Sequence, residues 1–246
     1  KYKCKNTGRY FDVKTGTAFA NTKLPMKAWF YAMMLFLSHK RGVSSCQLAR
    51  DLGITQKTAW KMLHKIRQYM EMENSHTLSG EVEIDEAFVG GKNKNRHKDK
   101  KVEKCQGRSY KDKVPVFGIL ERGGKVIAKV VPNTQAKTIV PIIKEKVELG
   151  SVVYTDGWDY SGLHGSVDHE KHFYGTTYAT DEGEIIVVST NGIENVWSHF
   201  KRMIFGIYYH VSKKYMQRYI DEYIFRFNTR NFTDSQRFNL LLRNAA

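Results

Sequence analysis

Cysteine is scarce in this sequence of 246 residues. Cys4, Cys46 and Cys105 are odd in number and widely spaced, which excludes the disulfide framework of a small secreted domain. The sequence also lacks any run of roughly 18 apolar residues, the length that a membrane-spanning helix needs. These features predict a soluble protein of a reducing, intracellular compartment, which in a bacterium is the cytoplasm and its nucleoid.

Acidic residues are fewer than basic residues in this sequence. The chain has 25 Asp and Glu against 40 Lys and Arg, which gives a formal net charge of +15. A charge of this size indicates a polyanionic partner, and nucleic acid is the first candidate. An anionic membrane surface would favour a basic amphipathic helix or a polybasic tail, whereas here the charge is spread through both halves of the chain. The remaining interpretation is a basic protein without such a partner.

Residues 24–69 are predicted to be helical, because apolar residues recur there at helical spacing. Ser44 and Ser45 precede a short helix as caps, Gly53 follows it, and Thr55 caps a longer helix. This order predicts a helix-turn-helix unit, and an ordinary αα-hairpin is the alternative. The apolar face of the longer helix is formed by Ala59, Met62, Leu63 and Ile66.

The longer helix is expected to enter the major groove of DNA if the unit is a helix-turn-helix. Gln56, Lys57 and Thr58 lie near its start and are the candidates for contacts with DNA there. Lys61 and Lys65 follow within the same helix and are expected to contact phosphates.

The apolar periodicity changes from helix to strand after the polar, turn-rich linker at residues 70–80. Strands are predicted for EVEIDEAFVG, VPVFGILE and KVIAKVVP, followed by a helix for AKTIVPIIKEKVE, a fourth strand for SVVYTDG and two closing helices. This is the order of an RNase H-like α/β domain, in which helices flank a mixed sheet.

Three acids stand at informative places in these elements. Asp85 lies inside the first strand, where a carboxylate is costly unless it is paired or holds a cation. Asp156 ends the fourth strand, at the sheet edge where α/β folds build their sites, although such an Asp is also a common helix cap. Glu194 lies on a helix with Asn191 as its expected N-cap. Lys201, seven residues after Glu194, projects from nearly the same line of that helix.

Carboxylates from these three elements would converge on divalent cations, because hard oxygen ligands suit Mg²⁺ or Mn²⁺. Two such ions, roughly 3.5 to 4 Å apart, serve phosphodiester chemistry by activating the attacking oxygen and stabilising the leaving one. We therefore expect Asp85, Asp156 and Glu194 to be metal ligands and Lys201 to hold a DNA phosphate.

Four ordered stretches resemble the motifs of one family. VEIDEAFVGGK is similar to its first-aspartate motif, VVYTDGW to the second, TNGIENVWSHFKR to the third, and GIYYHVSKKYMQRYIDEYIFRFNTR to its closing helix. Through these motifs the chain resembles the DDE insertion-sequence transposases, in the branch that bacterial elements share with the eukaryotic Merlin elements (ISXO2-like transposase domain). The resemblance extends over about residues 1–232.

The resemblance implies metal-dependent cleavage at transposon ends and transfer of the freed 3′-hydroxyl into target DNA. The implied partners are terminal inverted repeats, target DNA and a second copy of the chain. Asp85 and Asp156 carry over directly as catalytic residues, whereas Glu194, Asn195 and Asn191 compete for the third position. Glu194 is preferred, because an anionic oxygen binds Mg²⁺ better than an amide and because it aligns with Lys201.

The rival pair, Asn195 and Arg202, has the same seven-residue spacing, and Arg202 is a candidate for DNA contact. His210 follows the expected helix end at Gly206 and is a further candidate. Two alternative functions stay open: a catalytically inactive transposase-derived DNA-binding protein, and a structure-specific nuclease of the RNase H-like fold.

Residues 1–22 resemble the end of the family's N-terminal zinc ribbon, but Thr7 stands where the second Cys of a C-x-x-C pair would be, so no zinc site is predicted. The expected organisation continues with a helix-turn-helix domain at 23–76, a catalytic domain at 77–232 and a C-terminal tail at 233–246.

Overall fold

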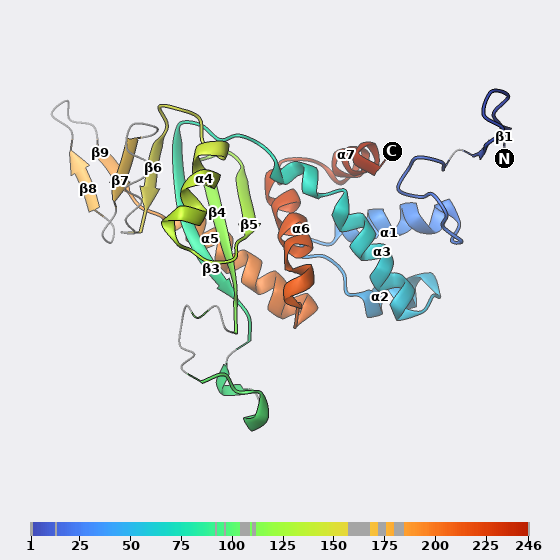
Figure 1. Cartoon of the computed structure of the whole chain (residues 1–246), viewed down its shortest axis with the longest axis horizontal. Helices are drawn as coiled ribbons and strands as arrows, with labels where there is room; N and C mark the ends of the chain where they lie inside the picture. Colours follow the sequence, from blue (N-terminus) through green and yellow to red (C-terminus); the bar gives the residue numbers. More distant parts are fainter. Residues whose placement is uncertain are drawn as a thin grey trace. The chain divides into compact units, whose positions relative to one another are not determined.

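The chain, described by a computed structural model over residues 2–12, 14–91, 93–95, 97–103, 109, 112–156, 168–171, 176–179 and 185–245, forms two compact units (Figure 1). The first comprises Lys1–Met72 and Thr229–Ala246, and the second comprises Glu73–Asn228. Both divisions lie four residues earlier than the sequence predicts, at 72 against 76 and at 228 against 232.

The first unit is helical apart from an N-terminal antiparallel hairpin. Its helix α1 packs against α2, α3 and α7. The segment expected to be a C-terminal tail instead forms a helix, α7. Burial of Leu241 and Ala245 stabilises this helix. The elements are β1 (Tyr2–Lys3), β2 (Tyr10–Phe11), α1 (Met26–Ser38), α2 (Ser45–Leu52), α3 (Gln56–Gln68) and α7 (Asp234–Ala245).

The ends of α2 and α3 follow from local chemistry. Ser44 and Thr55 each accept the backbone N–H three residues on, at 3.1 and 3.3 Å, so both predicted caps are confirmed. Gly53 ends α2 in the left-handed conformation with φ of 63°. Ser45 is the first helical residue and not a cap, and its hydroxyl accepts from Gln56 Nε2 at 2.7 Å.

The second unit is built on a mixed five-stranded sheet of order β5-β4-β3-β6-β7 (Figure 1). Neighbours β3, β4 and β5 are antiparallel, whereas β3, β6 and β7 are parallel. The predicted order of three strands, a helix and a fourth strand is confirmed, but three further strands that the sequence did not predict, β7, β8 and β9, precede the closing helices. The elements are η1 (Glu71–Asn74) at the unit boundary, β3 (Glu81–Val89), η2 (Asn93–Asn95), η3 (Lys98–Lys100), β4 (Val114–Glu121), β5 (Val126–Val130), α4 (Ala136–Lys146), β6 (Val152–Thr155), β7 (Asp168–Lys171), the antiparallel pair β8 (Thr176–Ala179) and β9 (Ile185–Val188), α5 (Asn191–Met203), the π-helix η5 (Ile204–Tyr208), η6 (Lys213–Tyr215) and α6 (Met216–Asn228).

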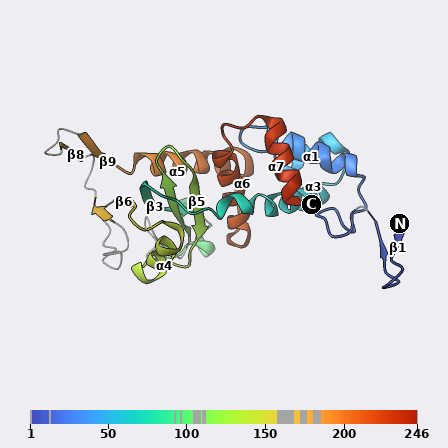
Figure 2. The same cartoon turned by 90° about the horizontal axis from the view of Figure 1, so that it is seen from above.

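Helices cover both faces of this sheet, with α4 on one side and α5 on the other (Figure 2). The alternation of side chains along β3 separates two cores. Val82 and Ile84 pack in the core that includes α4, whereas Ala87 and Val89 pack in the core that includes α5 and α6. None of the described helices is both long and apolar enough to cross a bilayer.

The helix α5 lies close to the sheet because Gly118 of β4 has no side chain. A Cβ at Gly118 would collide with the ring of Trp197, which is buried on α5. Gly118 is also the residue paired with Asp85 across the β3–β4 ladder. The predicted apolar stripe of this helix, which faces the sheet as expected, comprises Ile193, Val196, Trp197, Phe200 and Ile204.

Candidate active site

Asp85 and Asp156 lie on adjacent parallel strands. Ile84 of β3 is paired with Thr155 of β6, so Asp156, the next residue, reaches the level of Asp85. A carboxylate oxygen of each aspartate and one of Glu86 lie within 4.8 Å of one another. Within the described part of the chain, this is the group of acids whose oxygens are close enough to share a cation.

Glu194, the predicted third metal ligand, is not part of this close group and lies exposed in the first turn of α5. Its negative charge acts on the carboxylate of Asp85, whose pKa it raises. The competing candidates, Asn191 and Asn195, are exposed in the same turn. Lys201 is half-buried and Arg202 is exposed in the last turn of α5.

Burial is the main cause that raises the pKa of Asp85 to about 7. The negative charges of Asp156, Glu86 and Glu194 raise this pKa further, and the backbone N–H of Glu86 opposes them by donating to the carboxylate. Among the described residues, the charges that shift this pKa are negative, which is the environment that a divalent cation would neutralise.

Glu86 is a site residue that was not predicted from the sequence. Alternation along β3 directs its side chain to the face opposite Asp85, yet one of its oxygens belongs to the close group. The pairing of β3 with β6 ends at Ile84, so residues 85 and 86 stand beyond the end of that neighbour, where their carboxylates can approach the same point. The available signal was that Glu86 directly follows Asp85 and so breaks the alternation of acidic and apolar residues along this strand.

A buried ion pair ties this part of β3 to α5. Glu83, of which 4% is exposed, accepts from the backbone N–H of Ile193 at 2.9 Å and from Arg122 Nε at 2.9 Å. Asn191, the expected N-cap, is instead the first helical residue of α5, and Thr190 at the cap makes no capping bond. Glu83 supplies the acceptor that this helix terminus needs, from a strand far away in the sequence.

Arg122, the partner of Glu83, also contacts β6. Its guanidinium lies 4.0 Å from the ring centroid of Tyr154, donates to Glu81 at 3.3 Å and donates to the carbonyl of Ser189 at 2.9 Å. The hydroxyl of Tyr154 in turn donates to Glu81 at 2.9 Å. One arginine therefore contacts β3, β6 and the segment entering α5, the three elements that carry Asp85, Asp156 and Glu194.

Comparison with known proteins shows the family to which the chain belongs. A family model described as the ISXO2-like transposase domain matches residues 77–228. The chain belongs to this transposase family. It is 28% identical over 166 residues to a protein of Halobacterium salinarum described as an uncharacterized protein in transposable element ISH50, covering 64% of this chain and 55% of that protein. It is also 37% identical over 111 residues to an uncharacterized transposase-like protein of Haemophilus influenzae, covering 42% of this chain and 81% of that protein.

A solved structure, the Mos1 strand transfer complex, resembles the chain with 10% identity and a TM-score of 0.34, over 92% of this chain and 80% of that chain. This similarity is too low to show a shared fold. The transposase family therefore rests on the sequence matches, and the chain spans little more than half of the ISH50 protein that it matches.

The predicted DNA-contacting residues outside the transposase domain lie on α3. Gln56, Lys57 and Lys61 are exposed there, whereas Thr58 and Lys65 are half-buried. Gln56 is engaged by Ser45, and Lys65 Nζ lies 5.9 Å from the ring centroid of Trp29. Lys57 and Lys61, one turn apart, are therefore the cations that α3 presents most openly.

The ion pair between Arg122 and the buried Glu83 predicts the effect of removing the arginine. Arg122→Ala should destabilise the second unit by roughly 3 kcal/mol, because it leaves the Glu83 carboxylate without its cation. Arg122→Lys should recover only part of this loss, since an ammonium cannot reproduce the guanidinium fork. Lys146→Ala is the control, because Lys146 pairs with the exposed Glu145 and should cost less than about 1 kcal/mol. Denaturant unfolding measures all three, and equal stabilities of the two alanine variants would contradict the assigned role.

The raised pKa of Asp85 predicts a stability that falls as pH rises. The folded chain holds a proton on Asp85 up to about pH 7, whereas the unfolded chain releases it near pH 4, so folding binds an extra proton between these values. The free energy of unfolding should fall through this window by at most about 1.4 kcal/mol per pH unit.

Thermal unfolding in EDTA from pH 4 to pH 8 checks this expectation. Asp85→Asn should remove that slope and be the more stable protein at pH 8. Glu148→Gln, at an exposed acid of the same unit, is the control and should keep the wild-type profile. A profile of Asp85→Asn that runs parallel to the wild type would show that Asp85 ionises normally.

Proposed function

We propose that the chain is a DDE transposase that cleaves DNA at transposon ends and joins the freed 3′-hydroxyl to target DNA. The convergence of Asp85 and Asp156 from neighbouring strands is the observation that carries this proposal. The family match and the net charge of +15 support a DNA substrate. In this proposal the second unit is an RNase H-like catalytic domain, and two copies of the chain act on paired ends.

The donor set fits divalent metal ions. Carboxylate oxygens are the hard ligands that Mg²⁺ and Mn²⁺ prefer, and the close acids concentrate negative charge at one end of β6. Asp85 and Asp156 would hold the ions, with Glu86 beside them and Glu194 as the third ligand from α5. Bound there, a pair of ions would activate the attacking oxygen and stabilise the leaving one.

The residues around the acids would place the DNA. Lys201 projects from nearly the same line of α5 as Glu194 and is suited to hold a DNA phosphate near the acids. Arg202 is exposed beside it and would contact a neighbouring phosphate. In the first unit, α3 would act as the recognition helix of a helix-turn-helix, with Gln56 and Thr58 near the bases and the lysines on phosphates.

The catalytic assignment predicts that Asp85→Asn and Asp156→Asn each lower cutting of terminal-repeat DNA by more than about a hundredfold, the size expected when one stabilising group of a reaction centre is lost. Glu194→Gln should do the same, whereas Asn195→Ala should retain activity. Cleavage of labelled DNA in Mg²⁺ measures each variant, with Glu148→Gln as the exposed control.

The same assay separates the alternatives. Cleavage without end joining would identify a structure-specific nuclease. Specific binding of repeat DNA without any metal-dependent cutting would identify an inactive, transposase-derived binding protein. Loss of activity in Asn195→Ala but not in Glu194→Gln would move the third position to the amide.

The assignment of α3 predicts that Lys57→Ala and Lys61→Ala each reduce the slope of log K against log salt by about 0.9, one phosphate contact per lysine. Binding to repeat DNA, measured by fluorescence anisotropy from low to moderate salt, gives this slope. Lys27→Ala, at an exposed lysine of α1 in the same unit, should leave it unchanged. Equal slopes for all three variants would remove α3 from the DNA interface.

A further inference from the structure

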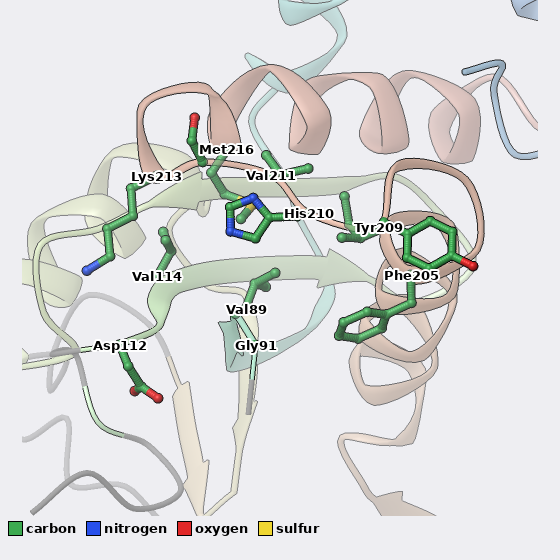
Figure 3. Close-up of a pocket in the computed structure, with 13 residues that line it drawn as sticks. Val89, Gly91, Asp112, Val114, Phe205, Tyr209, His210, Val211, Lys213 and Met216 are labelled. Atoms are coloured by element: carbon green, nitrogen blue, oxygen red, sulfur yellow. The ribbon is translucent and has the colours of Figure 1, made fainter. Parts of the chain in front are cut away.

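A cavity of about 300 Å³ lies beside the end of β3 in the second unit. Its wall is largely apolar, with Val89, Val114, Ile204 and Met216 contributed by the core beneath α5 and α6. In Figure 3 the rings of Phe205 and Tyr209 lie toward one side and Lys213 and Asp112 toward the other, with His210 between them. This volume is at the lower end of the roughly 300 to 1,000 Å³ typical of small-molecule sites.

The backbone at this cavity is irregular. The α5 helix passes directly into the π-helix η5, a conformation that is rare and frequent at functional sites. Tyr209 then adopts φ of 58°, which costs free energy in a residue with a side chain. Two large rings stand at this cavity, where 81% of Tyr209 and 53% of Phe205 are exposed. Their exposure means that burial in the core does not explain them.

A line of side chains connects the acids to this cavity. Glu194, Ser198, Lys201 and Phe205 follow one another at spacings of four, three and four residues, which keeps them on one line of α5 and its continuation. The eleven residues from Glu194 to Phe205 correspond to a rise of about 16 Å. The line presents a carboxylate first, then a cation and finally an aromatic ring.

We propose that this cavity binds one unpaired nucleobase of the DNA strand whose phosphates pass Lys201. The inference rests on the proposed function and extends it with a second contact on the same strand. Aromatic rings stack on any base, and Lys213 and His210 suit the adjoining phosphates. The carboxylate of Asp112, which also lines the cavity, suits a base with an exocyclic amino group. The rise of about 16 Å is close to five nucleotide steps of about 3.4 Å.

The experiment uses the full chain carrying Asp156→Asn, in EDTA, with terminal-repeat duplexes that contain one unpaired nucleotide. The unpaired position is moved from the first to about the sixth nucleotide from the cleaved bond. At one position, the unpaired base should tighten binding by roughly 5- to 100-fold, the range that stacking on an aromatic ring provides. An abasic site at that position should give no gain.

The variants at Tyr209 test whether the cavity is responsible. Tyr209→Phe should keep the gain, since the ring remains, whereas Tyr209→Leu and Phe205→Ala should reduce it at least about fivefold. Tyr209→Gly should abolish the gain while raising the melting temperature, because glycine accepts the positive φ without strain. A merely structural tyrosine would not show this combination. Leu149→Ala, at an exposed apolar residue of the same unit, is the control and should keep the gain.

The outcomes separate this inference from the catalytic proposal. A gain that is absent at every position, or that survives Tyr209→Leu and Phe205→Ala, overturns the cavity assignment even if the wild-type chain cuts DNA. A gain that depends on Tyr209 upholds it even if no cleavage occurs in Mg²⁺. A chain that binds none of these duplexes overturns both.

Discussion

Repulsion between carboxylates is the interaction that this structure has to oppose. Asp85, Glu86 and Asp156 bring oxygens within 4.8 Å of one another in a partly buried place, where like charges interact more strongly than in water. The carboxyl of Asp85 responds by holding its proton more tightly, with a pKa of about 7. Such a group persists only if the elements that carry it are fixed by stronger contacts elsewhere, or if cations enter.

The contacts that fix these elements lie two residues away on the same strand. Glu83 shares with Asp85 the face of β3 that α5 covers, but it is surrounded by donors: the guanidinium of Arg122 and the N-terminus of α5. Glu83 and Asp85 therefore lie on the same face of β3 in opposite electrostatic environments. Glu83 is compensated from within the protein and joins three elements, whereas the described charges that act on Asp85 are those of Asp156, Glu86 and Glu194, which suits it to an ion from outside. Gly192 permits this arrangement, since a Cβ there would come within 2.7 Å of Glu83 Oε2.

Features that depend on neighbouring residues could be predicted from the sequence. The caps at Ser44 and Thr55 and the apolar stripe of α5 follow from spacings of three and four residues, which the sequence displays directly. The order of the second unit from β3 to β6 follows from the change of period after residue 80, whereas β7, β8 and β9 were not predicted. Asp85 and Asp156 could be placed near each other because both belong to strands that end toward the same edge.

Features that depend on distant pairing could not be predicted in this way. The acceptor at the start of α5 comes from Glu83, 110 residues earlier, so the local pattern pointed to Asn191 instead. Glu86 joins the acids only because the pairing of β3 with β6 ends at Ile84, and strand register is not visible in a single sequence. The segment after residue 232 was predicted to be a tail, and it folds because α1 offers a surface for α7.

The helix α5 leads from Glu194 in its first turn to the cavity at its end. Its first turn is held by Glu83, its middle by the contact of Trp197 with Gly118, and its last turn continues into a π-helix instead of ending in solvent. Because the rise per residue of an α-helix is constant, fixing its start and middle also fixes the position of its last turn. The separation between Glu194 and Phe205 along the helix axis is therefore set by the backbone of α5 and its continuation. A DNA strand laid along this helix would meet the carboxylates and the rings at a fixed separation, which is what the recognition of a defined nucleotide near a cleaved bond requires.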